Sequence, residues 1–168
     1  MKALLRVKEM NGMTEQQLEH YIIQYRSTVF RLAYSIVKNR EDADDITQDA
    51  FMKLYISEIS FERDENVKAW LIRVTINLSK DLLKSGWRRH RAELTDDIPF
   101  ESSREELLLD SVKKLKADYS IIIYLFYYER YTVNEIARLR NTTSAAVRTK
   151  LTRARGQLRK LLSKEDLF

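Results

Sequence analysis

The sequence contains no cysteine, and it has only three glycines and one proline among its 168 residues. Without cysteine the chain can form no disulfide, thiolate zinc site or cysteine nucleophile. With so little glycine and proline it lacks the residues that build the tight turns of a sandwich or barrel, so helices joined by short loops are favoured. Because 44% of the residues are hydrophobic, which is enough for helical cores, we expect a folded, all-α protein.

Histidine is also scarce, since His20 and His90 are the only two and lie far apart in the chain. At that spacing each is interpreted as a surface or interface residue rather than a metal ligand. No nucleophile stands beside a base, and the sequence has no glycine-rich phosphate loop. We therefore expect no metal, no cofactor and no catalytic residue, and we do not expect an enzyme.

No apolar run in the sequence reaches the roughly 18 residues of a membrane span. Charged residues interrupt the apolar ones near the N-terminus, which argues against a targeting segment. We expect a soluble, cytoplasmic protein with no membrane insertion of its own. A capping-box pattern, TEQQ, begins at Thr14, so residues 1–13 are interpreted as an N-terminal extension.

Charge is distributed unevenly along the chain. Residues 1–92 hold 16 basic and 13 acidic side chains, residues 93–110 hold one and seven, and residues 111–168 hold 13 and five. The only proline, Pro99, lies in the acidic stretch AELTDDIPFESSREE, which has too few apolar residues to pack. We predict a helical module at residues 14–91, a flexible acidic linker at 92–106 and a basic helical module at 107–168 that faces a polyanion.

Hydrophobic periodicity and capping signals place the helices. Asn39 and the pair Thr132 and Glu135 stand where helix N-caps are expected. The run IIIYLFYY fits a buried helix or a strand, and its β-branched and aromatic content favours a strand. We choose a helix because a lone strand would have no partner. The predicted helices cover residues 14–38, 40–55, 67–89, 104–116, 118–128, 132–139 and 144–160.

The last of these helices, SAAVRTKLTRARGQLRK, has six basic residues and no acidic one. Its apolar stripe, with steps of three and four residues, comprises Val147, Leu151, Ala154, Leu158 and Leu161. By itself this pattern also fits a solvated amphipathic helix. The short capped helix and the turn before it give helix-turn-helix spacing, which would place the last helix in the major groove of DNA.

The segment NREDADDITQDAF carries Glu41, Asp45 and Asp49 on one helical face, with Asp44 and Gln48 beside it. Acids near a helix start complement the helix dipole, and carboxylates in successive turns can bind a metal ion. Like charges four residues apart repel each other, however, so a basic partner that covers this face is a third interpretation. The metal interpretation is weak, because neither histidine nor a second acidic segment completes a site.

The segment VKAWLIRVTINLSKDLLKSGWRRHR interleaves tryptophans with basic residues. Trp70 fits a core position better than a stacking platform, whereas the basic side chains suit a nucleic-acid backbone. Phe61, in the polar loop before this segment, is placed to stack on or enclose an unpaired base.

In this order the three segments resemble the extracytoplasmic-function (ECF) sigma factors of bacterial RNA polymerase, over about residues 14–162. NREDADDITQDAF is similar to the family's region-two pattern of Asp-x-x-Gln followed by an acid, and AWLIRVTIN to its Trp-Leu-x-Arg-Ile-Ala-x-Asn. YTVNEIA and AAVRTKLTRARGQL resemble its C-terminal helix-turn-helix. Each motif alone is permissive, whereas three in the correct order across an acidic linker are specific.

The resemblance implies an initiation factor that binds core RNA polymerase, at the clamp helices of the largest subunit and the flap of the second. It would recognise the minus-35 and minus-10 elements of promoter DNA and promote melting, for a set of genes that responds to stress or another signal. The acidic linker would thread toward the polymerase's active-site and RNA-exit channel. Regulation would come from a separate protein, an anti-sigma factor.

The resemblance also assigns residues to these roles. The polymerase-binding residues would be Asp45, Gln48, Asp49 and Tyr55. The residues that hold the melted minus-10 strand, with one base flipped into a pocket, would be Phe61, Glu62, Arg63, Asp64, Asn77, Lys80, Lys84 and Arg88. The minus-35 residues would be Thr132, Arg148, Thr149, Arg153 and Arg155.

Four positions depart from the family pattern. Asn141 and Thr142 stand in the turn where glycine or a Cys/Ile-like residue is common, and asparagine tolerates a left-handed conformation, so we expect the turn to form. Ala145 and Ala146 stand where Gly-Thr is frequent, which removes a hydroxyl from the DNA face. Binding to the minus-35 element is therefore expected, but its base sequence stays open.

Two other functions are alternatives. A helix-turn-helix repressor or activator would bind duplex DNA alone, as a dimer on two half-sites, yet no heptad seam for a dimer is visible. An enzyme acting on nucleic acid would need the catalytic groups that the sequence lacks. The acidic and basic helices together favour the initiation factor.

Overall fold

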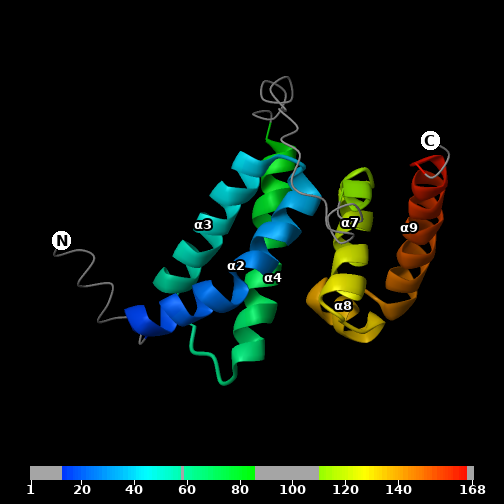
Figure 1. Cartoon of the computed structure of the whole chain (residues 1–168). Helices are drawn as coiled ribbons and strands as arrows, with labels where there is room; N and C mark the ends of the chain where they lie inside the picture. The colour runs from blue at the N-terminus through cyan, green and yellow to red at the C-terminus, as the bar shows by residue number, and fades with distance from the viewer. Residues whose placement is uncertain (1–12, 58, 86–109, 166–168) are drawn as a thin grey trace.

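The protein is all-helical in the computed structural model, which describes residues 13–57, 59–85 and 110–165. Figure 1 shows α2, α3 and α4 packed together, with α7, α8 and α9 beside them and α3 on the side away from α9. The all-α prediction is confirmed. The elements are α2 (Glu15–Val37), α3 (Arg40–Ile56), α4 (Asp64–Lys84), α7 (Ala117–Ile123), the π-helical turn η1 (Tyr124–Tyr128), α8 (Val133–Leu139) and α9 (Ser144–Glu165).

The predicted N-caps confirm where the helices begin. The Thr14 hydroxyl accepts from the backbone N–H of Gln17, whose side chain accepts from the Thr14 N–H, and this capping box opens α2. The Asn39 side chain accepts from the Asp42 N–H at 2.9 Å at the start of α3. Each cap satisfies a backbone donor that the first helical turn would leave without a partner.

The third helix differs from its prediction at both ends. It begins at Asp64 rather than Val67, because two acidic residues in the first turn suit the positive end of the helix dipole. It ends at Lys84 rather than Arg89, where Ser85 takes an extended conformation and donates its hydroxyl to the Leu82 carbonyl. The predicted site residue Arg88 lies outside the described residues, as does the predicted linker at 92–106.

The run IIIYLFYY is helical, as predicted, but it is not one α-helix. After α7 the chain widens into η1, where the Glu129 N–H donates to the Tyr124 carbonyl five residues earlier, at 3.2 Å. The helix predicted at 104–116 is helical at 110–113, the part that the structure describes, and is separated from α7 by the extended Lys116. The sequence contains no signal for the extra residue of a π turn.

Two apolar clusters stabilise the fold. One joins the first half of α2 to α3 and α4, through Tyr25, Val29, Ala50, Phe51, Leu54, Val67 and Leu71. The other joins the second half of α2, with Leu32 and Ile36, to residues of α7 and α9 such as Ile122 and Leu151. The second cluster therefore runs across the two predicted modules.

The second cluster generates a stability prediction. Ile36 is fully buried, whereas Ile23 on the same helix is 78% exposed. We expect Ile36→Ala to lower the free energy of unfolding by about 2–5 kcal/mol, since it leaves a cavity in the cluster. The matched change Ile23→Ala should alter it by no more than about 0.5 kcal/mol. Urea unfolding followed by circular dichroism measures both, and equal losses would contradict the assignment of the core.

Candidate polymerase and nucleic-acid interfaces

The acidic residues of α3 lie on its solvent face. Asp45, Gln48 and Asp49 are exposed, whereas Ile46, Ala50 and four other apolar or polar residues on the opposite face are buried. Tyr55 is half-buried near the end of the helix. The structure thus brings the four predicted polymerase-binding residues onto one helix, with three of them free of the core. We call this surface, with Asp45, Gln48, Asp49 and Tyr55, the acidic face.

The dipole interpretation accounts for only part of this acid. Glu41 and Asp42 belong to the first turn of α3, where a carboxylate is stabilised by the helix N-terminus. Asp45 and Asp49 lie one and two turns farther along, beyond the reach of that effect. Within the described residues no group of three or more His, Cys, Asp or Glu side chains is arranged to hold a metal ion.

Exposed apolar side chains extend the acidic face. Met52 is 58% exposed and Ile56 is 52% exposed, and they follow Gln48 at steps of four residues along α3. Sequence reasoning missed both residues, because an apolar side chain in an amphipathic helix is assigned to the core by default. The signal that could have found them is the i, i+4 spacing from Gln48.

The loop before α4 places the first of the predicted minus-10 residues. Glu62 and Arg63 are exposed, and Phe61 is half-buried with its ring edge-on to Trp70, at 6.0 Å between centroids. Both aromatic rings pack against the cluster around Tyr25. Trp70 is therefore part of the core margin, as preferred from the sequence, and it supports Phe61 from below.

Asp64 is anchored rather than free. The Tyr21 hydroxyl donates to its carboxylate at 3.1 Å, and the Tyr25 hydroxyl donates to its backbone carbonyl at 3.2 Å. Burial and the hydrogen bond to Asp64 raise the pKa of Tyr21, so the phenol keeps its proton. Among the predicted minus-10 residues, Asp64 is the one that pins the start of α4 to α2.

One face of α4 is basic and polar. Arg73, Asn77, Lys80 and Lys84 follow one another at steps of four, three and four residues, so they share a side of the helix. Arg73, Asn77 and Lys84 are exposed, whereas the Lys80 ammonium lies 2.8 Å from the carboxylate of Asp118 on α7. Arg73 was not among the predicted site residues, although its spacing from Asn77 could have found it.

The helix-turn-helix forms at α8 and α9. Asn141 takes the left-handed conformation expected of it, with φ of 50°, and the Thr142 N–H donates to the Ala137 carbonyl at 2.9 Å. Thr143 and Ser144 fix the start of α9: the Thr143 hydroxyl accepts from the Ala146 N–H, and the Ser144 hydroxyl donates to the Asn134 side chain at 2.6 Å.

The predicted minus-35 residues fall into two groups. Arg148, Thr149 and Arg153 are exposed on α9, opposite the buried stripe that contains Val147, Leu151 and Ala154. Thr132 and Arg155 have partners within the chain. Thr132 forms the capping box of α8 with Glu135, and Arg155 donates to the Tyr127 hydroxyl at 2.6 Å with its guanidinium 5.2 Å from the Phe126 ring.

Comparison with protein-family models finds two matches. The model described as sigma-70 region 2 matches residues 21–89, and the model described as sigma-70 region 4 matches residues 105–158. In the described part of the chain no helix has the length and apolar character to cross a membrane.

Two relatives match nearly the whole chain. The chain is 30% identical to the RNA polymerase sigma factor SigV of Bacillus subtilis (strain 168) over 162 residues, which cover 92% of this chain and 96% of that protein. It is 24% identical to the ECF RNA polymerase sigma factor SigW of the same organism over 177 residues, covering 94% and 95%.

Two solved structures share the fold. The sigma factor RpoE in complex with the anti-sigma factor NepR, from Bartonella quintana, superimposes with a TM-score of 0.70 and 20% identity, covering 86% of this chain and 96% of that one. CnrH in complex with the cytosolic domain of CnrY gives a TM-score of 0.66 and 20% identity, covering 96% and 97%. At this identity the likeness concerns the fold alone.

The left-handed turn of the helix-turn-helix can be tested with two substitutions at one position. Asn141→Gly should leave the stability unchanged or slightly altered, since glycine adopts a positive φ readily. Asn141→Val should lower the free energy of unfolding by about 1–2 kcal/mol, because a β-branched residue is strained in this conformation. Urea unfolding measures the difference, and equal stability of the two variants would contradict the assigned turn.

Proposed function

The chain belongs to the extracytoplasmic-function group of the sigma-70 family of RNA polymerase sigma factors, and on that premise we propose which of its surfaces carry out each part of initiation. A sigma factor of this family binds core RNA polymerase and recognises promoter DNA, so its partners are the polymerase and the promoter. The family consists of initiation factors; we propose that this protein has no catalysis of its own and that it acts in the cytoplasm.

The acidic face of α3 is the proposed polymerase-binding surface. Its carboxylates are exposed and lie too far along the helix to serve the dipole, and like charges on one face are stabilised by a basic partner. Met52 and Ile56 would add apolar contact at the end of the same face. This combination of exposed acid and exposed apolar side chains is the observation that carries the proposal.

The basic face of α4 and the loop around Phe61 are the proposed minus-10 surface. Arg73, Lys80 and Lys84 would contact phosphates, and Asn77 lies among them with an amide that can bond a base edge. Phe61 and the exposed Glu62 and Arg63 would enclose a flipped base. Unstacking a base costs a few kcal/mol, which contacts to its edge and to the flanking phosphates offset.

The exposed face of α9 is the proposed minus-35 surface. Arg148, Thr149 and Arg153 occupy the side of α9 that enters the major groove in a helix-turn-helix. Thr132 would act at the N-terminus of α8, and Arg155 would have to leave Tyr127 to reach DNA. We further propose the modules as residues 14–91 and 107–168, joined by residues 92–106, and regulation by an anti-sigma factor of the kind present in the two solved structures.

The polymerase assignment makes a direct prediction. Asp45→Ala combined with Gln48→Ala should reduce co-purification with core polymerase at least tenfold, because both exposed contacts of the acidic face are removed while the buried face is intact. Gln16→Ala combined with Glu19→Ala, an equally spaced and exposed pair on α2, is the matched control and should bind as the wild type does. Wild-type binding by the α3 variant would refute the assignment.

The two DNA surfaces should respond differently to substitution. If Arg153 is bidentate to a guanine, Arg153→Ala should lose about 1–3 kcal/mol at that position of the minus-35 element and relax specificity there. Lys84→Ala should weaken binding on every promoter and lower the slope of affinity against salt by about one. Run-off transcription with core polymerase on genomic fragments, followed by salt titration on the mapped promoters, separates the two effects. Uniform losses from both variants would count against this division.

A further inference from the structure

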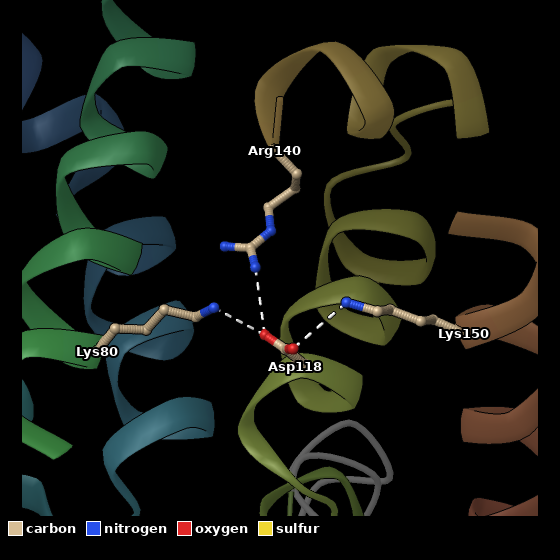
Figure 2. Close-up of polar contacts among 4 residues, drawn as sticks. All are labelled: Lys80, Asp118, Arg140 and Lys150. Atoms are coloured by element: carbon tan, nitrogen blue, oxygen red, sulfur yellow. Dashed lines mark hydrogen bonds and ion pairs between the residues drawn. The ribbon is translucent and has the colours of Figure 1, made fainter. Parts of the chain in front are cut away.

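The N-terminal and C-terminal parts of the chain are held together by ion pairs as well as by apolar packing. We call the surface where α2 and α4 meet α7 and η1 the module contact. At its centre the Asp118 carboxylate receives three cations, as Figure 2 shows: Lys80 of α4 at 2.8 Å, Arg140 at 3.2 Å and Lys150 of α9 at 3.3 Å. The hydrogen bond from Lys80 lowers the pKa of Asp118 against the opposing effect of partial burial, so the group is ionised at neutral pH.

A second ion pair crosses the module contact. The Lys68 ammonium of α4 lies 2.7 Å from the carboxylate of Glu129, whose side chain is only 8% exposed. The Tyr124 hydroxyl donates both to Glu129 at 3.1 Å and to the Thr28 carbonyl of α2 at 3.3 Å. Because Glu129 is the more buried partner, its charge is stabilised chiefly while Lys68 stays in place.

The module contact faces the proposed minus-10 surface. A cleft of about 480 Å³ lies between α4 and the helix-turn-helix, with Arg73, Asn77 and Ile76 on one side and Arg138, Arg140 and Asn141 on the other. Two surfaces proposed to bind nucleic acid therefore face each other. In the described part of the chain no carboxylate pairs with Arg73 or Arg138, so Asp118 supplies negative charge at the edge of a basic cleft.

Promoter geometry is incompatible with this arrangement. The two elements are named for positions about 25 base pairs apart, which is about 85 Å along B-DNA at 3.4 Å per base pair. α4 and α9 are each about 30 Å long and lie on either side of α7 (Figure 1). While Lys80 contacts Asp118, the chain cannot place α4 on one element and α9 on the other.

We propose that the module contact is an autoinhibitory closed form of this sigma factor, in which Asp118 takes the place of a DNA phosphate for Lys80 and Lys150. The inference rests on the proposed function of α4 and α9. Opening exchanges the Lys80 to Asp118 pair for a Lys80 to phosphate pair, so DNA and Asp118 compete for one cation. The acidic face of α3 lies on the side of the bundle away from α7 and α9 and stays accessible in the closed form (Figure 1).

Core polymerase is the partner that would open the protein. Separation of the modules exposes apolar side chains of the shared cluster, which is unfavourable in water unless another surface covers them. Polymerase can bind the acidic face first and then cover these side chains. The 24 residues at 86–109 that connect the two parts are covalently long enough, at no more than about 3.5 Å per residue, for the separation that a promoter needs.

The distance between two spin labels tests the closed form. The absence of cysteine allows labels at Gln24→Cys on α2 and Gln157→Cys on α9, which are both exposed. The free protein should give one short distance by double electron-electron resonance, and core polymerase should shift it to a longer one. Asp118→Asn should raise the ratio of open to closed protein roughly 2- to 10-fold, the effect of one or two partly exposed ion pairs.

Matched variants distinguish the latch from a change of net charge. Asp81→Asn alters the same charge on exposed α4 next to Lys80 and should leave the distance unchanged. Lys68→Gln breaks the other ion pair and should open the protein as Asp118→Asn does, with circular dichroism to show that both variants are folded. Asp118→Asn should also bind a short random-sequence duplex roughly 2- to 10-fold more tightly than Asp81→Asn does.

The outcomes separate this inference from the proposed function. A free wild-type protein with the same distances as its polymerase complex would overturn the closed form, as would identical distances in Asp118→Asn and Asp81→Asn. Run-off transcription with the labelled wild type tests the function independently. Failure to transcribe would overturn both the function and the autoinhibition, whereas transcription with unchanged distances would overturn the closed form alone.

Discussion

The burial of α2 is the constraint on which the rest of the structure depends. Its first half contributes Tyr25 and Val29 to the cluster with α3 and α4, and its second half contributes Leu32 and Ile36 to the cluster that reaches α7 and α9. Both clusters need the same helix, so the acidic face, the basic face of α4 and the helix-turn-helix are positioned by one element. The exposed surfaces are then what remains once α2 is covered on both sides.

Local patterns in the sequence predicted most of the helices and the surfaces on them. The caps at Thr14, Asn39 and Thr132 and the stripe through Val147 are properties of neighbouring residues, so periodicity and capping rules find them. The left-handed Asn141 was predicted for the same reason. The exposure of Asp45, Gln48 and Asp49 followed from their place opposite the apolar side of α3.

Features that depend on contacts through space were not predicted. The end of α4 at Lys84 and the π turn at Tyr124 depend on how neighbouring helices pack rather than on local periodicity. The pairing of Arg155 with Tyr127 joins residues 28 positions apart, and that of Lys80 with Asp118 crosses the region read as a linker. The sequence suggests two separate modules because it records composition along the chain, whereas the shared apolar cluster arises only when the chain is folded.

The π turn has a consequence for the length of the chain. A regular α-helix turns about 100° per residue, so the one extra residue between Tyr124 and Tyr128 rotates everything after it by about that angle. This rotation is what turns Tyr127 outward to meet Arg155, while Tyr124 stays buried with its hydroxyl on α2. The segment from Ala117 to Glu129 therefore acts as a ruler with a fixed number of divisions. Shortening it by one would point the helix-turn-helix in another direction although every helix could still form.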